Sequence, residues 1–399
     1  MLFASTDLPA GAHALLVALA TPAPSGTTGI PVLLWGRPGV GKSSFIEGLA
    51  REDLQVTTLI ASIHDPTDFS GLPVLDGGSV RYAAPRWVND FGADGNGILF
   101  LDELSTAPPS VQAALLRVVF ERRVGFTPLP DGVRIVAAAN PPDLMVGGWE
   151  LSPPLRNRFV HLNWDIPAEL YRAALTDGWK RATVPEVNPV AHARALEGIR
   201  LRVAGFLRLH PDALHGDPEE GSFGFASPRT WDYAAALLAT CAVLGVRAGD
   251  GEPGGQRVLL QLLAGCLGDG VAIPFVEYLR DIRLPAAEEL LDEEATVAIS
   301  ELNDSEVYIL LYEMRRLLLA DLSSPALARR SEVFLRYVAD VFADGRRDVI
   351  FAPLRDLARS NWIAALAASS DEAAREAALA AIGDVFSDAA FAEFVDVLG

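Results

Sequence analysis

The sequence predicts an α/β protein, with a three-layer domain built on a parallel five-stranded sheet, then an α-helical lid and a C-terminal helical region. Between residues 30 and 165, short apolar runs alternate with helical stretches and Gly or Pro punctuation, which is typical of parallel strands joined by crossover helices. After Asp165 the β-rich runs fade, and segments rich in Ala and Leu follow. The chain has 399 residues, half of them hydrophobic, which is enough for two or three packed domains.

Five apolar runs are the predicted strands of this sheet: Pro31–Trp35, Val56–Ile60, Ile98–Leu101, Val133–Ala139 and Phe159–Leu162. We expect the α/β domain to span residues 1–165, the helical lid residues 166–286 and the C-terminal helical region residues 287–399. In the last region Asn303 precedes Glu306 at the spacing of a helix capping box. A second helix there carries an apolar stripe, which we expect to be core rather than a partner-binding groove: Val333, Phe334, Tyr337, Val338, Val341 and Phe342.

Composition argues against several classes of function. Lys and Arg total 33 against 52 Asp and Glu, and the formal charge of −19 disfavours nucleic acid as the main partner. Cys241 and Cys266 are too few for a disulfide framework and lack metal-ligand spacing, so we expect no zinc site and a reducing cytoplasm. The apolar run at residues 8–24 is too short to span a bilayer, and no Lys or Arg precedes it. We expect it to be a first helix, with no membrane insertion.

A phosphate-binding loop is predicted directly after the first strand. The segment GRPGVGKS matches GxxxxGK[ST] and is followed by a helix-compatible run, the context that supports the motif over a chance glycine turn. Glycines let backbone N–H groups point at phosphate oxygens, and the next helix adds its dipole. Lys42 would reach the β and γ phosphates, and Ser43 would ligate magnesium. The predicted loop residues are Gly36, Arg37, Pro38, Gly39, Val40, Gly41, Lys42, Ser43 and Ser44.

Polar residues follow two later strands. The run GILFLDEL delivers Asp102 and Glu103 at the carboxyl end of a buried strand, where ligands of open α/β sheets bind. Asp102 would hold the magnesium through water, and Glu103 would act as general base on the attacking water. Asn140 ends the next strand and would orient that water or touch the γ phosphate. Taken alone, an apolar run ending in Asp-Glu usually marks a strand meeting solvent, and an Asn before Pro is usually a turn residue.

Three arginines lie near or beyond the last predicted strand. In LSPPLRNRF, Arg156 and Arg158 precede the last strand, and an arginine there would enter a neighbouring subunit's site if the chain forms rings. Arg158 is the preferred finger, while one of the pair is expected to satisfy helix-end carbonyls. In FASPRTW, Ser227 is a predicted N-cap and Arg229 lies in the first turn, where a cation opposes the helix dipole. A γ phosphate or a carboxylate would compensate that charge.

Taken in order, these motifs resemble the MoxR-type AAA+ ATPases, in the branch that includes magnesium chelatase ATPase subunits. The resemblance covers about residues 25–250 and also rests on HDPTDFSGLP, AAANPP and the segment from Gly97 to Gly125. It places Walker A on Lys42, Walker B on Asp102, sensor 1 on Asn140, the arginine finger on Arg158 and sensor 2 on Arg229. Arg156 departs from the family pattern, because it is an extra arginine beside the finger.

The resemblance implies ATP and Mg²⁺ as cofactors, hexameric homo-oligomeric rings, and a protein client that bears, in some members, a von Willebrand factor A domain. It also implies two insertions that grip substrates, here at residues 68–87 and in a hairpin around residues 121–136. The predicted function is therefore ATP hydrolysis that drives chaperone-like remodelling or activation of a partner protein. Two alternatives stay open at this point: a nucleic-acid-dependent motor, and a nucleotide-gated scaffold with little turnover.

Overall fold

The fold is described by a computed structural model for residues 8–91, 95–144, 148–218, 223–246, 248 and 253–387. The chain divides into two compact units, Met1–Ile199 with Pro211–Leu279 and Arg200–His210 with Arg280–Gly399. The sheet lies in the first unit, and the second is helical. Most of the segment predicted as a lid thus shares a compact unit with the sheet. The domain boundaries at residues 165 and 286 stay predictions.

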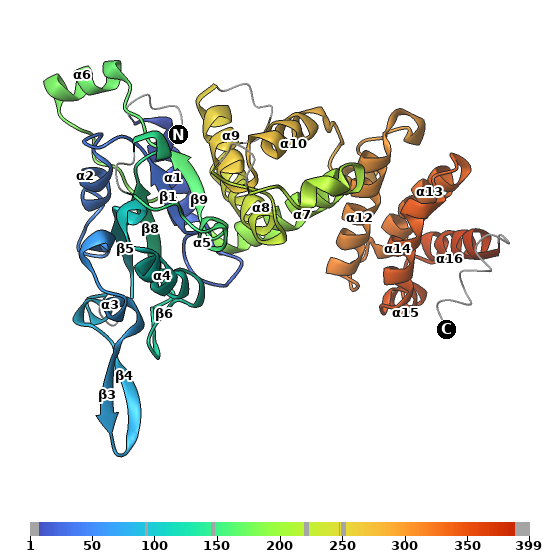
Figure 1. The fold of residues 1–399 in the computed structure, drawn as a ribbon. Helices are drawn as coiled ribbons and strands as arrows, with labels where there is room; N and C mark the ends of the chain where they lie inside the picture. Colours follow the sequence, from blue (N-terminus) through green and yellow to red (C-terminus); the bar gives the residue numbers. More distant parts are fainter. Residues whose placement is uncertain are drawn as a thin grey trace. The chain divides into compact units, whose positions relative to one another are not determined.

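The central sheet has five strands in the order β2-β5-β8-β1-β9, all of them parallel (Figure 1). The predicted parallel sheet is confirmed, and every strand end lies within one residue of its expected position. The strands are Val32–Trp35 (β1), Gln55–Ile60 (β2), Gly97–Asp102 (β5), Val133–Ala139 (β8) and Val160–Asn163 (β9). The inner strands β1, β5 and β8 are buried almost throughout, so their sequences are continuous apolar runs.

Helices cover the sheet and complete the first unit. Leu33 and Leu101 pack in one cluster with Leu115 of α4, whereas the neighbouring residue Leu34 lies outside that cluster. The helices are Ala10–Ala20 (α1), Lys42–Glu47 (α2), Thr67–Ser70 (α3), Pro109–Glu121 (α4), Pro153–Arg156 (α5), Ala168–Asp177 (α6), Pro189–Leu209 (α7), Pro228–Val243 (α8), Pro253–Leu267 (α9) and Asp269–Asp281 (α10). Residues 200–209 of α7 and the last two residues of α10 belong to the second unit.

The predicted first helix is confirmed as α1, and its residues from Gly11 to Ala20 are buried. It packs against α9 and β9, and α9 in turn packs on β9 at the edge of the sheet. Gly265 of α9 makes this approach possible, because a Cβ there would lie 2.2 Å from the carbonyl oxygen of His161. In the part of the chain that the structure describes, no helix combines the length and apolarity needed to cross a bilayer.

Two hairpins occupy the segments where insertions are expected. The longer one pairs Leu72–Asp76 (β3) with Ser79–Ala83 (β4) and projects away from the sheet (Figure 1). The shorter one pairs Arg123–Val124 (β6) with Thr127–Pro128 (β7), directly after α4. Large apolar side chains on the longer hairpin are exposed to solvent: Leu72, Val74, Leu75, Val80 and Tyr82.

The second unit is a helical assembly with its own core. Its remaining helices are Ala287–Leu291 (α11), Asp304–Ala320 (α12), Leu327–Ala343 (α13), Arg347–Ala358 (α14), Trp362–Ala367 (α15) and Glu372–Ser387 (α16). The predicted capping box of Asn303 and Glu306 begins α12. The predicted stripe on α13 packs in the core, with only Phe342 partly exposed. Trp362 is buried there and donates its indole N–H to Ser331 Oγ at 2.9 Å.

Candidate nucleotide-binding site

A glycine-rich loop joins β1 to α2 at the carboxyl edge of the sheet. Gly39 and Gly41 both have a φ of 80°, in the left-handed region that favours glycine. Gly41 is also the N-cap of α2, so the loop turns directly into the helix at Lys42. This strand, loop and helix arrangement is the context that the phosphate-loop motif requires.

Lys42 is buried within this loop. Its Nζ donates to the carbonyl oxygens of Gly36 at 2.6 Å and Arg37 at 3.2 Å, and to Asn140 Oδ1 at 3.4 Å. Burial lowers the pKa of Lys42, and the charge of Asp102 partly restores it. The ammonium therefore lies among oxygen acceptors and close to a carboxylate, in the loop where the sequence predicts a phosphate.

Ser43 and Asp102 meet across the loop. Ser43 Oγ donates to Asp102 Oδ2 at 2.6 Å, which joins the start of α2 to the end of β5. One hydroxyl and one carboxylate oxygen are the hard ligands that Mg²⁺ prefers. The two predicted metal ligands are thus in contact, and their chemistry fits a magnesium ion.

Glu103 directly follows β5 in a left-handed conformation with a φ of 55°. This conformation is uncommon for a residue with a side chain, and such outliers cluster at functional sites. One carboxylate oxygen of Glu103 accepts a hydrogen bond from Ser62 Oγ at 2.9 Å. Sequence reasoning missed Ser62, which lies just after β2, because nothing in its local pattern indicates a partner 41 residues later.

Asn140 lies at the end of β8, next to the ends of β1 and β5. Its side-chain oxygen accepts from Lys42, and its backbone N–H donates to Ser105 Oγ at 3.3 Å. Ser105 is fully buried and was also missed. It ties the segment after Glu103 to the end of the neighbouring strand, which fixes the position of Asn140.

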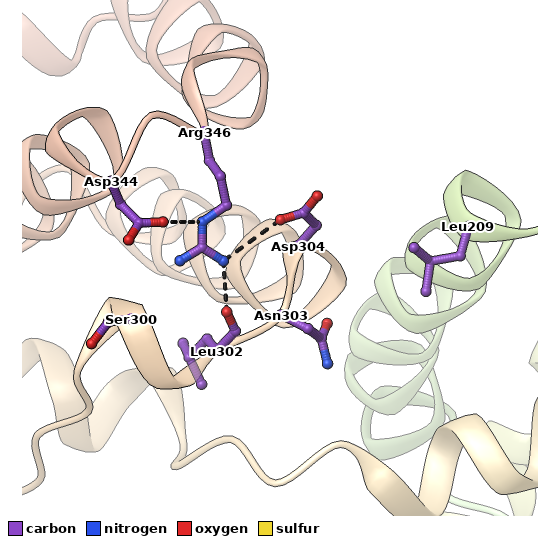
Figure 2. A pocket seen from close by; sticks show the side chains of 7 residues that line it. All are labelled: Leu209, Ser300, Leu302, Asn303, Asp304, Asp344 and Arg346. Carbon is purple, nitrogen blue, oxygen red and sulfur yellow. Dashed lines mark hydrogen bonds and ion pairs between the residues drawn. The ribbon is translucent and has the colours of Figure 1, made fainter.

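These residues line one cavity of about 290 Å³. The lining joins the phosphate loop to three acidic or amide side chains and contains Pro38, Gly39, Val40, Gly41, Lys42, Ser43, Ser44, Asp102, Glu103, Ala138, Ala139 and Asn140. A larger cavity of about 520 Å³ lies in the second unit (Figure 2). There Arg346 is engaged by Asp344 and by the carbonyl oxygens of Leu302 and Ile299, whereas the predicted loop residues line the smaller cavity.

The three arginines lie outside the described lining of that cavity. Arg156 turns inward, where its Nη2 donates to the carbonyl oxygen of Phe223 at 3.0 Å and its guanidinium lies over the Phe225 ring. One arginine of the pair is expected to satisfy helix-end carbonyls. The acceptor of Arg156 lies instead in the segment that leads into α8, and the arginine that binds a helix carbonyl is Arg158, through Pro154 of α5.

Arg158 and Arg229 lie together beside Phe120, near the end of α4. Their guanidinium carbons lie 4.3 Å and 5.4 Å from the centre of the Phe120 ring. Arg158 donates to the carbonyl oxygen of Pro154, and Arg229 donates to Asn157 Oδ1 at 3.1 Å. Burial lowers the pKa of Arg158, and the charge of Arg229 lowers it further. The predicted N-cap Ser227 of α8 is confirmed, with Pro228 at the first helical position.

An aromatic cluster links β1 to the segment that leads into α8. Trp35, the last residue of β1, stacks on Phe223 with ring centres 4.0 Å apart and an interplanar angle of 10°. Its indole N–H donates to His161 Nδ1 at 2.9 Å. Because Nδ1 accepts, the imidazole proton lies on Nε2, which donates to the carbonyl oxygen of Arg156 at 2.9 Å.

Comparison with known proteins agrees with this geometry. Residues 31–159 match the AAA domain family of the dynein-related subfamily. This segment is an AAA domain. It contains the predicted site residues Lys42, Ser43, Asp102, Glu103, Asn140, Arg156 and Arg158. The predicted resemblance to MoxR-type AAA+ ATPases is likewise confirmed.

The AAA domain has relatives among characterised bacterial proteins. The chain is 30% identical over 158 residues to the chaperone MoxR1 of Mycobacterium tuberculosis, and the aligned part covers 36% of this chain and 40% of that protein. It is 31% identical over 163 residues to the denitrification regulatory protein NirQ of Pseudomonas aeruginosa, which covers 38% of this chain and 60% of that protein. The chain thus spans about half the length of these relatives. A solved structure of a full-length MCM homolog from Methanopyrus kandleri is 18% identical, with a TM-score of 0.38, and covers 69% of this chain and 57% of that one.

Proposed function

We propose that this chain hydrolyses ATP with Mg²⁺ and uses the energy to remodel or activate a partner protein. The observation that carries the proposal is the 2.6 Å contact of Ser43 with Asp102, in a cavity that Lys42 and Glu103 also line. Phosphoryl transfer needs a phosphate cradle, a metal site and a group that acts on water, and this cavity contains residues suited to each task.

The roles of the residues follow from their chemistry. Lys42 and the loop N–H groups hold the β and γ phosphates, and Glu103 accepts a proton from the water that attacks the γ phosphorus. As the new P–O bond forms, the bond to the β–γ bridging oxygen breaks, and ADP and phosphate leave. Asn140 orients the water or the γ phosphate. When bound by Ser43 and Asp102, Mg²⁺ neutralises negative charge on the phosphates.

Completion of the site requires a neighbouring copy of the chain. Arg158 and Arg229 lie outside the described lining of their own cavity, yet they lie together around one ring. We infer that both contact the nucleotide of an adjacent subunit in a homo-oligomeric ring, with Arg158 as the arginine finger and a hexamer as the expected assembly. Arg156 is already engaged by Phe223 and is the weaker candidate.

The client is proposed to be a protein. The β3–β4 hairpin exposes Leu75 to 83% and Val80 to 54%, and apolar surface of this kind suits contact with protein segments. A chaperone-like role follows the MoxR resemblance, as does a client with a von Willebrand factor A domain. We place this activity in the cytoplasm, where ATP is available.

ATP turnover by the purified full chain tests the enzymatic proposal. Lys42→Ala and Glu103→Gln should each lower turnover at least about 100-fold, since one removes the phosphate ligand and the other the base. Glu103→Gln should still bind ATP tightly, whereas Lys42→Ala should not. Turnover of the natural chain no faster than that of Lys42→Ala would favour a nucleotide-gated scaffold.

The nature of the partner is tested separately. In cells, Glu103→Gln should stall with ATP and the client bound, so proteins that co-purify with it and not with Lys42→Ala are candidate clients. Stimulation of turnover by DNA or RNA, lost at moderate salt, would indicate a nucleic-acid motor instead. The charge of −19 leads us to expect no such stimulation.

A further inference from the structure

Phe120 is a large apolar residue in an unusual place. Its side chain is 55% exposed, while the buried residues of α4 are Val111, Gln112, Leu115, Val118 and Val119. The ring is therefore not part of the core beneath α4. Its described contacts are instead the guanidinium groups of Arg158 and Arg229.

The two arginines need something to hold them together. Arg158 carries a charge that Arg229 disfavours, and Arg229 also lies in the first turn of α8, where the helix dipole opposes a cation. Within the described residues neither forms an ion pair with a carboxylate, and Nε of Arg158 is buried without a hydrogen-bond partner. Each has one described hydrogen bond, to the uncharged oxygens of Pro154 and Asn157.

An aromatic face supplies the missing attraction. The ring quadrupole attracts a guanidinium within about 6 Å of the ring centre, and both arginines lie inside that limit. Unlike a carboxylate, the ring does not neutralise the cations. Both therefore keep their full charge for an incoming anion.

We propose that Phe120 is a positioning residue that holds Arg158 and Arg229 in place for the nucleotide of the adjacent subunit. This inference rests on the proposed function, because the arginines must act on a phosphate for their placement to matter. Preorganised charge stabilises a transition state more than charge that must first be brought into position. Loss of the ring should therefore lower kcat, while ATP binding in the chain's own cavity changes little.

The test compares three substitutions of Phe120 in the full chain. Phe120→Leu keeps apolar bulk but removes the π face, and should lower kcat about tenfold with less than a twofold change in KM for ATP. Phe120→Ala should lower kcat to a similar extent, again with little change in KM. Phe120→Tyr keeps the face and should recover most of the turnover lost in the Leu variant. Phe342→Leu is the matched control, because its ring lies over Arg347 in the other unit and its loss should leave kcat unchanged.

A double variant separates positioning from general damage. In an Arg158→Ala, Arg229→Ala background, Phe120→Leu should lower kcat no further, because no guanidinium remains to be held. If both arginine variants lose turnover while Phe120→Leu keeps it, the positioning role is wrong and the proposed function stands. The positioning role is likewise overturned if Phe120→Tyr loses as much turnover as Phe120→Leu. It is also overturned if Phe120→Leu lowers kcat further in the chain that already carries Arg158→Ala and Arg229→Ala. Full turnover in Arg158→Ala and Arg229→Ala would overturn the positioning role and the role of the arginines at a neighbouring site, while ATP hydrolysis itself would stand.

Discussion

Trp35 donates its indole N–H to Nδ1 of His161, and this bond fixes the imidazole as the neutral tautomer that donates to the carbonyl oxygen of Arg156. The donors and acceptor thus form a chain from the end of β1 to α5. A proton on Nδ1 would leave two N–H groups pointing at each other. Burial, partly offset by the bond to Arg156, lowers the pKa of His161 to about 4.

Acid should therefore weaken the fold at this site. The folded pKa of about 4 lies below the ordinary value of 6.5, so the unfolded chain binds more protons between these values. The stability that neutral His161 contributes is present above pH 6.5 and is lost as the pH falls toward 4, with a magnitude on the order of 3 kcal/mol. Denaturant titration of the natural chain and of His161→Gln at several pH values measures this contribution. The difference in unfolding free energy between the two proteins should become smaller as the pH falls from 6.5 to 4, and a constant difference would contradict the prediction.

Ser62→Ala should raise ATP turnover. The Ser62 hydroxyl occupies one oxygen of the Glu103 carboxylate, and a donor there competes with the water for the base. We expect kcat to rise about two- to fivefold with KM for ATP unchanged, measured by steady-state phosphate release. Ser62→Thr retains the hydroxyl and serves as the control. A fall in kcat for Ser62→Ala would show that the serine orients Glu103 productively.

Mixing two inactive variants should restore turnover if arginines act on a neighbour. Lys42→Ala chains lack a working loop but retain Arg158, whereas Arg158→Ala chains retain the loop. With random assembly at equal amounts, about one interface in four joins an intact loop to an intact arginine. In the control, Lys42→Ala is mixed with Glu103→Gln, and every cavity then lacks either the lysine or the base, whichever arginine lies beside it. An inactive first mixture, with assembly verified by light scattering, would place Arg158 in its own subunit's site.

Asn303→Ala should destabilise the second unit. Asn303 Oδ1 accepts hydrogen bonds from the backbone N–H groups of Ser305 and Glu306, each at 3.0 Å. The backbone N–H of Asn303 in turn donates to Glu306 Oε2 at 3.0 Å. Loss of such a cap costs about 0.5–2 kcal/mol of unfolding free energy. Chemical denaturation should show this loss in Asn303→Ala and little change in Asn303→Asp, which retains the acceptor. Equal losses in both would indicate a role other than capping.

The sequence predicted the sheet well because its strands are buried on both faces and therefore appear as continuous apolar runs. The loop, Asp102 and Glu103 were predictable for a related reason, since their motifs are local and parallel strands end at one edge. The structure brings Lys42, Ser43, Asp102, Glu103 and Asn140 together in one cavity. Their catalytic roles, like those of the arginines, stay predictions.

Contacts between segments that lie far apart in the chain could not be predicted from the sequence. The Ser62 contact with Glu103 depends on β2 lying beside β5, which spacing alone does not specify. For Arg229 the sequence suggested an anion, and the structure instead shows an amide oxygen and the Phe120 ring. Neither is charged, so no rule based on charge pairing would find them.

Lys42 has oxygen partners within its own loop, and these bonds affect the thermodynamics of nucleotide binding. A phosphate must replace the carbonyl oxygens of Gly36 and Arg37, so binding exchanges one set of hydrogen bonds for another. The enthalpy released should be smaller than the number of new contacts suggests. The same hydrogen bonds keep Lys42 and its loop in one conformation. Little conformational entropy therefore remains to be lost when ATP binds.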